Sequence, residues 1–338
     1  MVVPAFKLLL LCVGEIWRSS TDPSKVRGAR LCIYTVQLVS KWACPDMFAY
    51  ILLLYLLRSL GGDLVGSQVH LDMGFMHFSV FCICSTFSSL AIRLPARPPP
   101  EGSCRQSPQQ AQQHRRRREE KALVAQLRFW LVAGLALLFL LCLGAGICTS
   151  CMSLRVDTSL LVKPTGPLPS WVQPVLTWLD VASQTASDVK LWQCVVSLCW
   201  WSLDEANCFL ALLLLAVFAL ALPAANMVLL LCVSAGEVVS AVGSPPQPGH
   251  RKGYVSCASS AVHVLKHLSM LDVAITGIVV ACLVTGVYKE QGIVLSMGPG
   301  LAYLVLAEAI HYATYHLVQC SVTTAPEEVA QPAATSEP

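Results

Sequence analysis

Charged side chains beside apolar stretches are the residues of this chain best placed to do chemistry, because they are costly within a bilayer. Asp46 directly precedes the apolar run 47–57, and Asp272 directly precedes the apolar run 273–287. A carboxylate below the lipid headgroups needs a partner or a water-filled cavity, so both predict a polar transport path. Alternatively, each aspartate caps a helix whose preceding segment lies flat on the membrane, and Pro45 before Asp46 suits that interpretation.

A second group of polar residues lies near the end of the chain. Glu308 and His311 are three residues apart and share one face of a helix, which would suit a proton relay or an ion site. The alternative is a pair that simply hydrogen-bonds to another helix. His316 falls on a different face, so the spacing does not predict a metal triad.

Two further polar residues follow prolines at the start of apolar runs. Lys7 comes three residues after Pro4, and Asn226 comes three residues after Pro223. A proline can open a helix locally and free backbone groups beside such a side chain. Opened helices at matching places of two halves are typical of transporter binding sites, although the same spacing would serve plain helix packing.

These residues belong to an internal repeat. A Pro-Ala, a Leu-rich run ending in Cys-Val, a Gly-Glu, an Asp and a Met-Gly occur in the same order twice, between Pro4 and Gly74 and between Pro223 and Gly298. Two related halves are predicted, which fixes the architecture before any other assignment.

The amino-acid composition predicts whether these halves lie in a membrane or in water. Charged residues are 13% and hydrophobic residues 55% of the chain, whereas a soluble domain has about 25% charged residues. We therefore expect an all-α polytopic membrane protein with about seven transmembrane helices. The expected spans are the extreme N-terminus and residues 47–57, 74–92, 129–147, 206–233, 273–287 and 297–318. The N-terminal stretch also looks like a secretory signal, but it lacks a small-residue cleavage site.

Positive charges predict the sidedness. Lysine and arginine are abundant in alternate connecting segments, which should therefore face the cytosol. We expect a first membrane repeat of three helices over 1–92, a basic Pro/Gln/Arg-rich cytosolic linker over 93–127, and a second repeat of four helices over 128–320. The N-terminus would start outside, and an acidic disordered tail over 321–338 would lie in the cytosol. No folded nucleic-acid reader accompanies the basic run, so we expect lipid contact and no nucleic acid.

The predicted outer loop over 152–205 contains five of the eight tryptophans. Indole rings prefer the headgroup layer, so we expect Trp171 and Trp178 to hold this loop at the membrane interface. A small packed cap with a tryptophan core is the alternative. A zinc ribbon needs two Cys-x-x-Cys motifs, and this sequence lacks such a pair of motifs. We therefore expect no metal and no cofactor. The sequence leaves open whether four cysteines of the outer side form disulfides: Cys148, Cys151, Cys194 and Cys199.

Several of these patterns resemble the paraquat-inducible protein A family. They are Pro-x-x-Lys at Pro4, Trp-x-x-x-Asp-x-Phe from Trp42 to Phe48, its second version at 268–273, and the glycine at the start of each last helix. The resemblance implies tandem four-helix membrane repeats that act with lipid-carrying tunnel proteins to move phospholipid between membranes. This chain departs from it by lacking the first helix, lacking the zinc modules, and having Asn226 where the second half should have lysine. We therefore expect a divergent or N-terminally truncated member.

The expected function is non-enzymatic transport of phospholipid or another amphipathic lipid, since no nucleophile or metalloprotease motif is present. A scaffold or assembly subunit and an ion-coupled small-molecule transporter are the alternatives. The residues expected to line the path are Lys7, Asp46, Asn226, Asp272, Glu308 and His311. The expected partners are membrane lipids and a lipid-tunnel protein.

Overall fold

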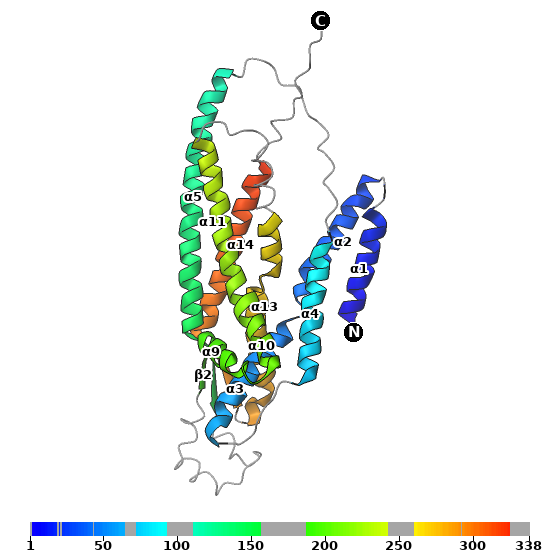
Figure 1. Ribbon diagram of the computed structural model, residues 1–338, viewed down its shortest axis with the longest axis vertical. Coiled ribbons are helices and arrows are strands. Elements are labelled where there is room, and N and C mark those ends of the chain that lie inside the picture. Colours follow the sequence, from blue (N-terminus) through cyan, green and yellow to red (C-terminus); the bar gives the residue numbers. More distant parts are fainter. Residues whose placement is uncertain are drawn as a thin grey trace.

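The computed structural model describes residues 2–18, 20, 22–42, 44–64, 72–92, 111–156, 187–242, 260–291 and 293–324. Long helices run along the long axis of the molecule, which confirms an all-α integral membrane protein with multiple spans (Figure 1). Four helices in this part of the chain are long and apolar enough to cross a bilayer. They are Met73–Ala91, Leu123–Cys148, Ala206–Val239 and Ser260–Thr285. The total of seven spans stays a prediction.

The helices of the first predicted repeat are α1 (Val2–Arg18), α2 (Pro23–Lys41), α3 (Pro45–Leu64) and α4 (Met73–Ala91). The second contains α5 (Ala111–Cys148), α9 (Leu191–Trp201), α10 (Ala206–Leu212), the π-helix η3 (Leu213–Ala221), α11 (Leu222–Val242), α13 (Leu271–Thr285), the 3-10 helix η4 (Gly286–Gln291) and α14 (Pro299–Thr324). The predicted linker is thus helical from Ala111 onward, where arginines and glutamates four residues apart favour a helix. Residues 325–338 of the predicted tail lie outside the described residues.

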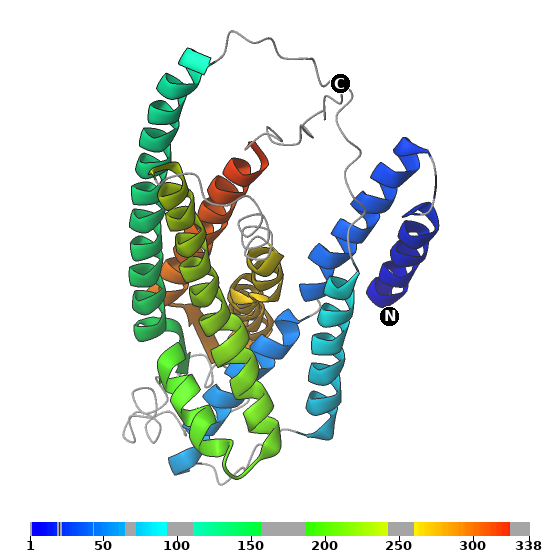
Figure 2. The same cartoon turned by 45° about the horizontal axis from the view of Figure 1, so that its top comes forward.

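The repeated landmarks lie at corresponding points of these helices. Asp46 and Asp272 are each the second residue of their helix, α3 and α13. Gly74 is the second residue of α4, and Gly298 directly precedes α14. Figure 2 shows α1, α2 and α4 grouped beside the bundle of α5, α11, α13 and α14, with α3 running from one group into the other. The first repeat is therefore joined to the second mainly through α3.

The crossing of α3 and α13 is close because it is built on a glycine. A Cβ atom added to Gly277 would lie 2.6 Å from Phe48 Cβ and 2.9 Å from the Pro45 carbonyl oxygen. Phe48 is fully buried, and Ile278 beside the glycine is 1% exposed. A side chain at position 277 would therefore separate the two helices that carry Asp46 and Asp272.

The fourth span is broken just before Asp272. Residues 260–268 are helical, but Ser269 and Met270 are not, and helix α13 starts at Leu271. The Met270 N–H donates to the Phe218 carbonyl oxygen of η3 at 2.9 Å. That carbonyl is available because its partner five residues on is Pro223, which has no N–H, while the Leu222 N–H donates to Val217. The opening predicted at Pro223 thus supplies the acceptor for a break in a neighbouring helix.

A small sheet closes the end of the bundle where α5 ends and α14 begins. Its strands are β1 (Ser150–Val156), β2 (Ser187–Lys190) and β3 (Ile293–Met297), in the order β2-β1-β3 and antiparallel. Met152 lies opposite both Val189 and Met297, and Met152 and Val189 are fully buried. The sequence analysis did not predict this sheet, although residues 152–156 of β1 alternate apolar and polar side chains. The sheet depends on pairing between segments far apart in the chain, which a local pattern does not indicate.

The tryptophans of α9, in the described part of the predicted outer loop, have different surroundings. Helix α9 exposes Trp192 and Trp200, at 47% and 69%, as an interfacial helix would. Trp201 instead packs against Tyr55 and lies under the Arg58 guanidinium, 4.8 Å from the ring centroid. Trp171 and Trp178 lie outside the described residues.

Candidate functional site

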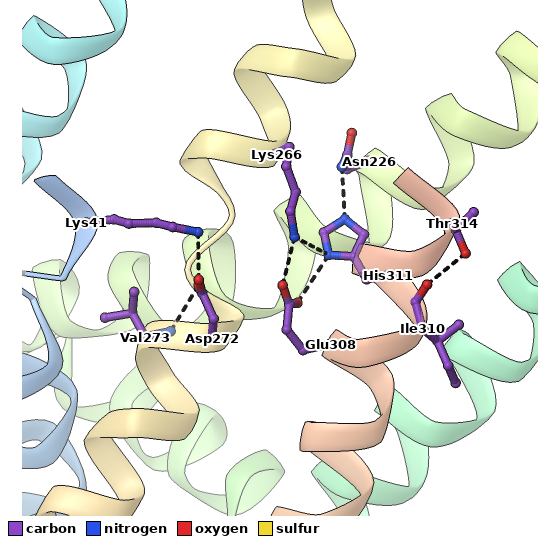
Figure 3. A network of polar contacts seen from close by, with 9 residues as sticks. All are labelled: Lys41, Asn226, Lys266, Asp272, Val273, Glu308, Ile310, His311 and Thr314. Carbon is purple, nitrogen blue, oxygen red and sulfur yellow. Dashed lines mark hydrogen bonds and ion pairs between the residues drawn. The ribbon is translucent and has the colours of Figure 1, made fainter. Parts of the chain in front are cut away.

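Three ionisable side chains meet inside the bundle beside the broken span. Lys266 Nζ donates to Glu308 Oε1 at 2.8 Å, and His311 Nδ1 lies 3.1 Å from Glu308 Oε2 (Figure 3). Lys266 comes from the helical segment before the break, whereas Glu308 and His311 lie one turn apart on α14. The side chains of Lys266 and Glu308 are 10% and 16% exposed, and that of His311 is fully buried. The three form a compact, largely desolvated charge cluster.

Asn226 of α11 completes this cluster and defines the state of the imidazole. Asn226 Nδ2 lies 2.9 Å from His311 Nε2, and its side chain is also fully buried. An amide nitrogen can only donate, so Nε2 accepts and the ring proton lies on Nδ1. The Nδ1–H then donates to Glu308. Lys266 Nζ lies 3.3 Å from Nδ1 but does not hydrogen-bond to it in this tautomer, because both groups are donors. This orientation of the Asn226 amide therefore suits an imidazole with no proton on Nε2.

A second ion pair joins the two repeats. Lys41 Nζ at the end of α2 lies 2.6 Å from Asp272 Oδ2 in the first turn of α13 (Figure 3). The Lys41 side chain is 7% exposed and that of Asp272 is 23% exposed. The other oxygen of Asp272, Oδ1, accepts the Val273 N–H at 3.0 Å. Asp272 therefore stabilises the first turn of α13 and has a buried cation as its partner, while its place in a transport path stays a prediction.

Asp46, the counterpart of Asp272, is not part of this site. It lies in the first turn of α3 but is exposed, and in the part of the chain that the structure describes it makes no hydrogen bond or ion pair. Its position suits the helix-start interpretation. The two equivalent aspartates thus have different surroundings, although the sequence predicted the same role for both.

Lys7 also lies apart from the cluster. Its Nζ donates to Ser85 Oγ of α4 at 2.6 Å and reaches the Ser85 carbonyl oxygen at 3.3 Å. The polar residue of α1 thus contacts the last helix of its own repeat, as Asn226 of α11 contacts His311 of α14. His316 packs against Tyr312 and not against the cluster, in agreement with its different helix face.

The sequence analysis did not single out two buried, ion-paired lysines as candidate site residues. Lys41 and Lys266 were counted only as positive charges that set the sidedness, yet their residues are 6% and 8% exposed. A usable signal exists, because each lysine precedes the aspartate of its repeat by a similar distance, five residues for Lys41 and six for Lys266. With two lysines, two carboxylates and a neutral imidazole, the site has no net charge.

At the opposite end of α3, Arg58 Nη2 lies 2.7 Å from Glu205 Oε1, with side chains 14% and 26% exposed. This pair also links the first repeat to the second. Within the described residues, no three His, Cys, Asp or Glu side chains are grouped to hold a metal ion. Cys148, Cys151, Cys194 and Cys199 are free thiols.

Comparison with known proteins gives no match to a protein-family model, a curated protein or a solved structure.

Proposed function

We propose that this chain is a non-enzymatic transport protein that binds phospholipid, or another amphipathic lipid, where its two repeats meet. The observation that carries this is the Lys41–Asp272 ion pair, which places opposite charges between the predicted repeats, beside the buried Lys266–Glu308 pair. Charges in a membrane bundle are typical of substrate and ion pathways, and sites between inverted or parallel repeats are typical of transporters.

An amphipathic ligand suits the two kinds of surface around this junction. Ammonium groups such as those of Lys41 and Lys266 are common phosphate partners. Helix α4 meanwhile exposes Phe78, Phe81 and Phe87 along its length, at 43%, 55% and 47%. Acyl chains can pack on such a face while a headgroup reaches the lysines.

The resemblance to the paraquat-inducible protein A family supports the same cargo and adds a partner. In this proposal the partner is a lipid-carrying tunnel protein that docks on the outer side, at the end closed by the sheet and α9. The linker and the tail then lie in the cytosol, as the distribution of lysine and arginine predicts. An ion-coupled small-molecule transporter is the second candidate, favoured by the buried Glu308–His311 pair.

Mass spectrometry of the gently solubilised protein tests the proposal, because it identifies bound lipids and partners together. We expect the wild type to retain phospholipid after exchange into a lipid-free neutral detergent. Lys41→Met should lose it, since the variant lacks an ammonium group that can bind the phosphate. The matched control is Arg58→Gln with Glu205→Gln, which removes a buried ion pair elsewhere. Retention of no phospholipid by the wild type would refute lipid binding, and a stable protein partner without lipid would favour a scaffold.

A further inference from the structure

One polar atom of the buried cluster lacks a partner. Asn226 Oδ1 makes no hydrogen bond within the described residues, although its side chain is fully buried. A half-turn of the amide would bring Oδ1 to His311 Nε2 in place of Nδ2. That contact is a hydrogen bond only if Nε2 carries a proton, because two acceptors would otherwise face each other. The amide can therefore satisfy both the neutral and the doubly protonated imidazole.

We propose that His311 binds a proton at Nε2 together with an anionic phosphate group at Lys266. This rests on the proposed function, of which it specifies the ligand chemistry and the coupling ion. In the protonated state Nδ1–H still donates to Glu308 and Nε2–H donates to Asn226 Oδ1. The imidazolium then has a hydrogen-bond acceptor for each of its two N–H groups.

Charge balance couples the proton to the anion. With Lys266 positive, Glu308 negative and His311 neutral, the resting cluster has no net charge. A proton on His311 leaves one uncompensated positive charge in a largely desolvated site, which is costly within a membrane bundle. A phosphodiester carries one negative charge and restores neutrality. Proton and phosphate are thus expected to bind together.

The exposure of the cluster indicates how each ligand arrives. Tyr312 is 55% exposed, and Lys266 Nζ lies 5.4 Å from the centroid of its ring. Glu308 is the partly exposed carboxylate beside Lys266, whereas His311 is fully buried. The phosphate would approach Lys266 along the Tyr312 side, and the proton would reach the imidazole through Glu308.

The other groups packed around His311 leave it as the proton acceptor. Helix α5 presents Phe139, whose ring centroid lies 5.7 Å from that of the imidazole, and α11 presents Asn226. Asp272 of α13 is held by Lys41 of α2. In the segment before the break, His267 lies beside His263, with ring centroids 4.5 Å apart and ring planes tilted by 48°. Tyr315 of α14 lies farther along the same helix.

Proton uptake on lipid binding tests this directly. Purified protein in neutral detergent is titrated with phosphatidylglycerol, whose single negative charge is fixed, in weakly buffered solution with a pH-indicator dye. We expect proton uptake on lipid binding and a weaker affinity at pH 8 than at pH 6, because a proton that is taken up on binding makes the affinity fall as pH rises. Phosphatidylcholine should cause no uptake, because its choline cation balances the negative charge of its phosphodiester. Dimethyl phosphate tests whether the headgroup alone suffices: uptake with it assigns a free phosphate site, and uptake with phosphatidylglycerol only assigns a lipid site.

Three variants separate the roles by their charge. His311→Gln should take up no proton and bind at the weak high-pH level at every pH. Glu308→Gln leaves the resting cluster positive, so it should bind phosphatidylglycerol tightly without proton uptake. Lys266→Met should bind no anion. Arg58→Gln with Glu205→Gln should behave as the wild type, because this pair lies at the other end of α3.

The wild type alone can overturn the coupling. If the wild type binds phosphatidylglycerol equally tightly at pH 6 and at pH 8 and takes up no proton, the proton coupling is excluded. The proposed lipid binding would then remain. Absence of any lipid binding would remove the proposed function as well. Proton uptake that persists in His311→Gln would place the proton on another group. If His311→Gln does not fold, the binding of phosphatidylglycerol without proton uptake by Glu308→Gln tests the coupling independently.

Discussion

Lys41 Nζ and Asp272 Oδ2 lie 2.6 Å apart, and they join the end of α2 to the first turn of α13. The two residues are 231 positions apart in sequence and belong to different predicted repeats. The pair lies beside the break at Ser269 and Met270, so it fixes the place where the fourth span restarts. The relative position of the predicted repeats therefore depends on this charge pair, on the Arg58–Glu205 pair and on the α3–α13 crossing.

Removal of one member of this pair should destabilise the protein strongly. Lys41→Met leaves Asp272 without its cation, and breaking a largely buried pair costs about 3 kcal/mol. The double variant Lys41→Met with Asp272→Leu should recover most of that loss, because no unpaired charge remains. Thermal unfolding in detergent measures both. If the double variant loses as much stability as the sum of the losses of Lys41→Met alone and Asp272→Leu alone, the two residues act independently.

The glycine at the α3–α13 crossing should be sensitive to a single methyl group. Gly277→Ala places a Cβ atom 2.6 Å from Phe48 Cβ, so we expect a loss of about 1–3 kcal/mol. Gly144→Ala is the matched control, since nothing lies within 4 Å of a Cβ atom there, and it should be neutral or slightly stabilising. Equal unfolding midpoints for the two variants would contradict a close crossing.

Stability should fall at alkaline pH because of a buried thiol. Burial raises the pKa of Cys151 to about 11, while an unfolded cysteine has a pKa of about 8.5. Between these values the unfolded chain loses a proton that the folded chain keeps, so stability falls as pH rises, by up to about 3 kcal/mol. Cys151→Ala should flatten the pH profile of thermal unfolding. Cys199→Ala, at an exposed position, should leave it unchanged, and a profile equally steep in all three proteins would argue against this origin.

The sidedness of the molecule can be tested with native cysteines. Cys199 on α9 and Cys320 near the end of α14 are both exposed. Helix α9 and the C-terminal end of α14 lie toward opposite ends of the bundle (Figure 1). In variants that keep only one of them, a membrane-impermeant maleimide added to intact cells should label Cys199 and not Cys320. Labelling of Cys320 alone would invert the predicted orientation.

Sequence patterns predicted the site unevenly, for physical reasons. Helical periodicity placed Glu308 and His311 on one face because their spacing is local. Which other helices these two residues contact depends on tertiary packing. Periodicity alone therefore could not predict their contacts with Asn226 and Lys266. Asp46 and Asp272 have similar local sequences, yet only Asp272 meets a lysine, because α2 ends beside the start of α13. The positive-inside rule counts every lysine near a membrane helix in the same way, whether its side chain is exposed or buried. The rule therefore could not show that Lys41 and Lys266 are buried.

The fold was predicted more fully than the site. Apolar length and low charge are sufficient to predict membrane helices, because the bilayer imposes them. The three-stranded sheet depends on Ser150–Val156 meeting segments before α9 and α14, and the local pattern of one strand does not indicate this pairing. The break at Ser269 likewise depends on a carbonyl from η3.

The most direct test of lipid binding at the junction is a cryo-electron microscopy structure in nanodiscs that contain phosphatidylglycerol. We predict density for a headgroup phosphate at hydrogen-bond distance, about 3 Å, from Lys266 or Lys41, with acyl chains leaving the bundle beside it. A junction closed by the Lys41–Asp272 and Lys266–Glu308 pairs, with lipid only around the outside of the bundle at every pH, would contradict the account.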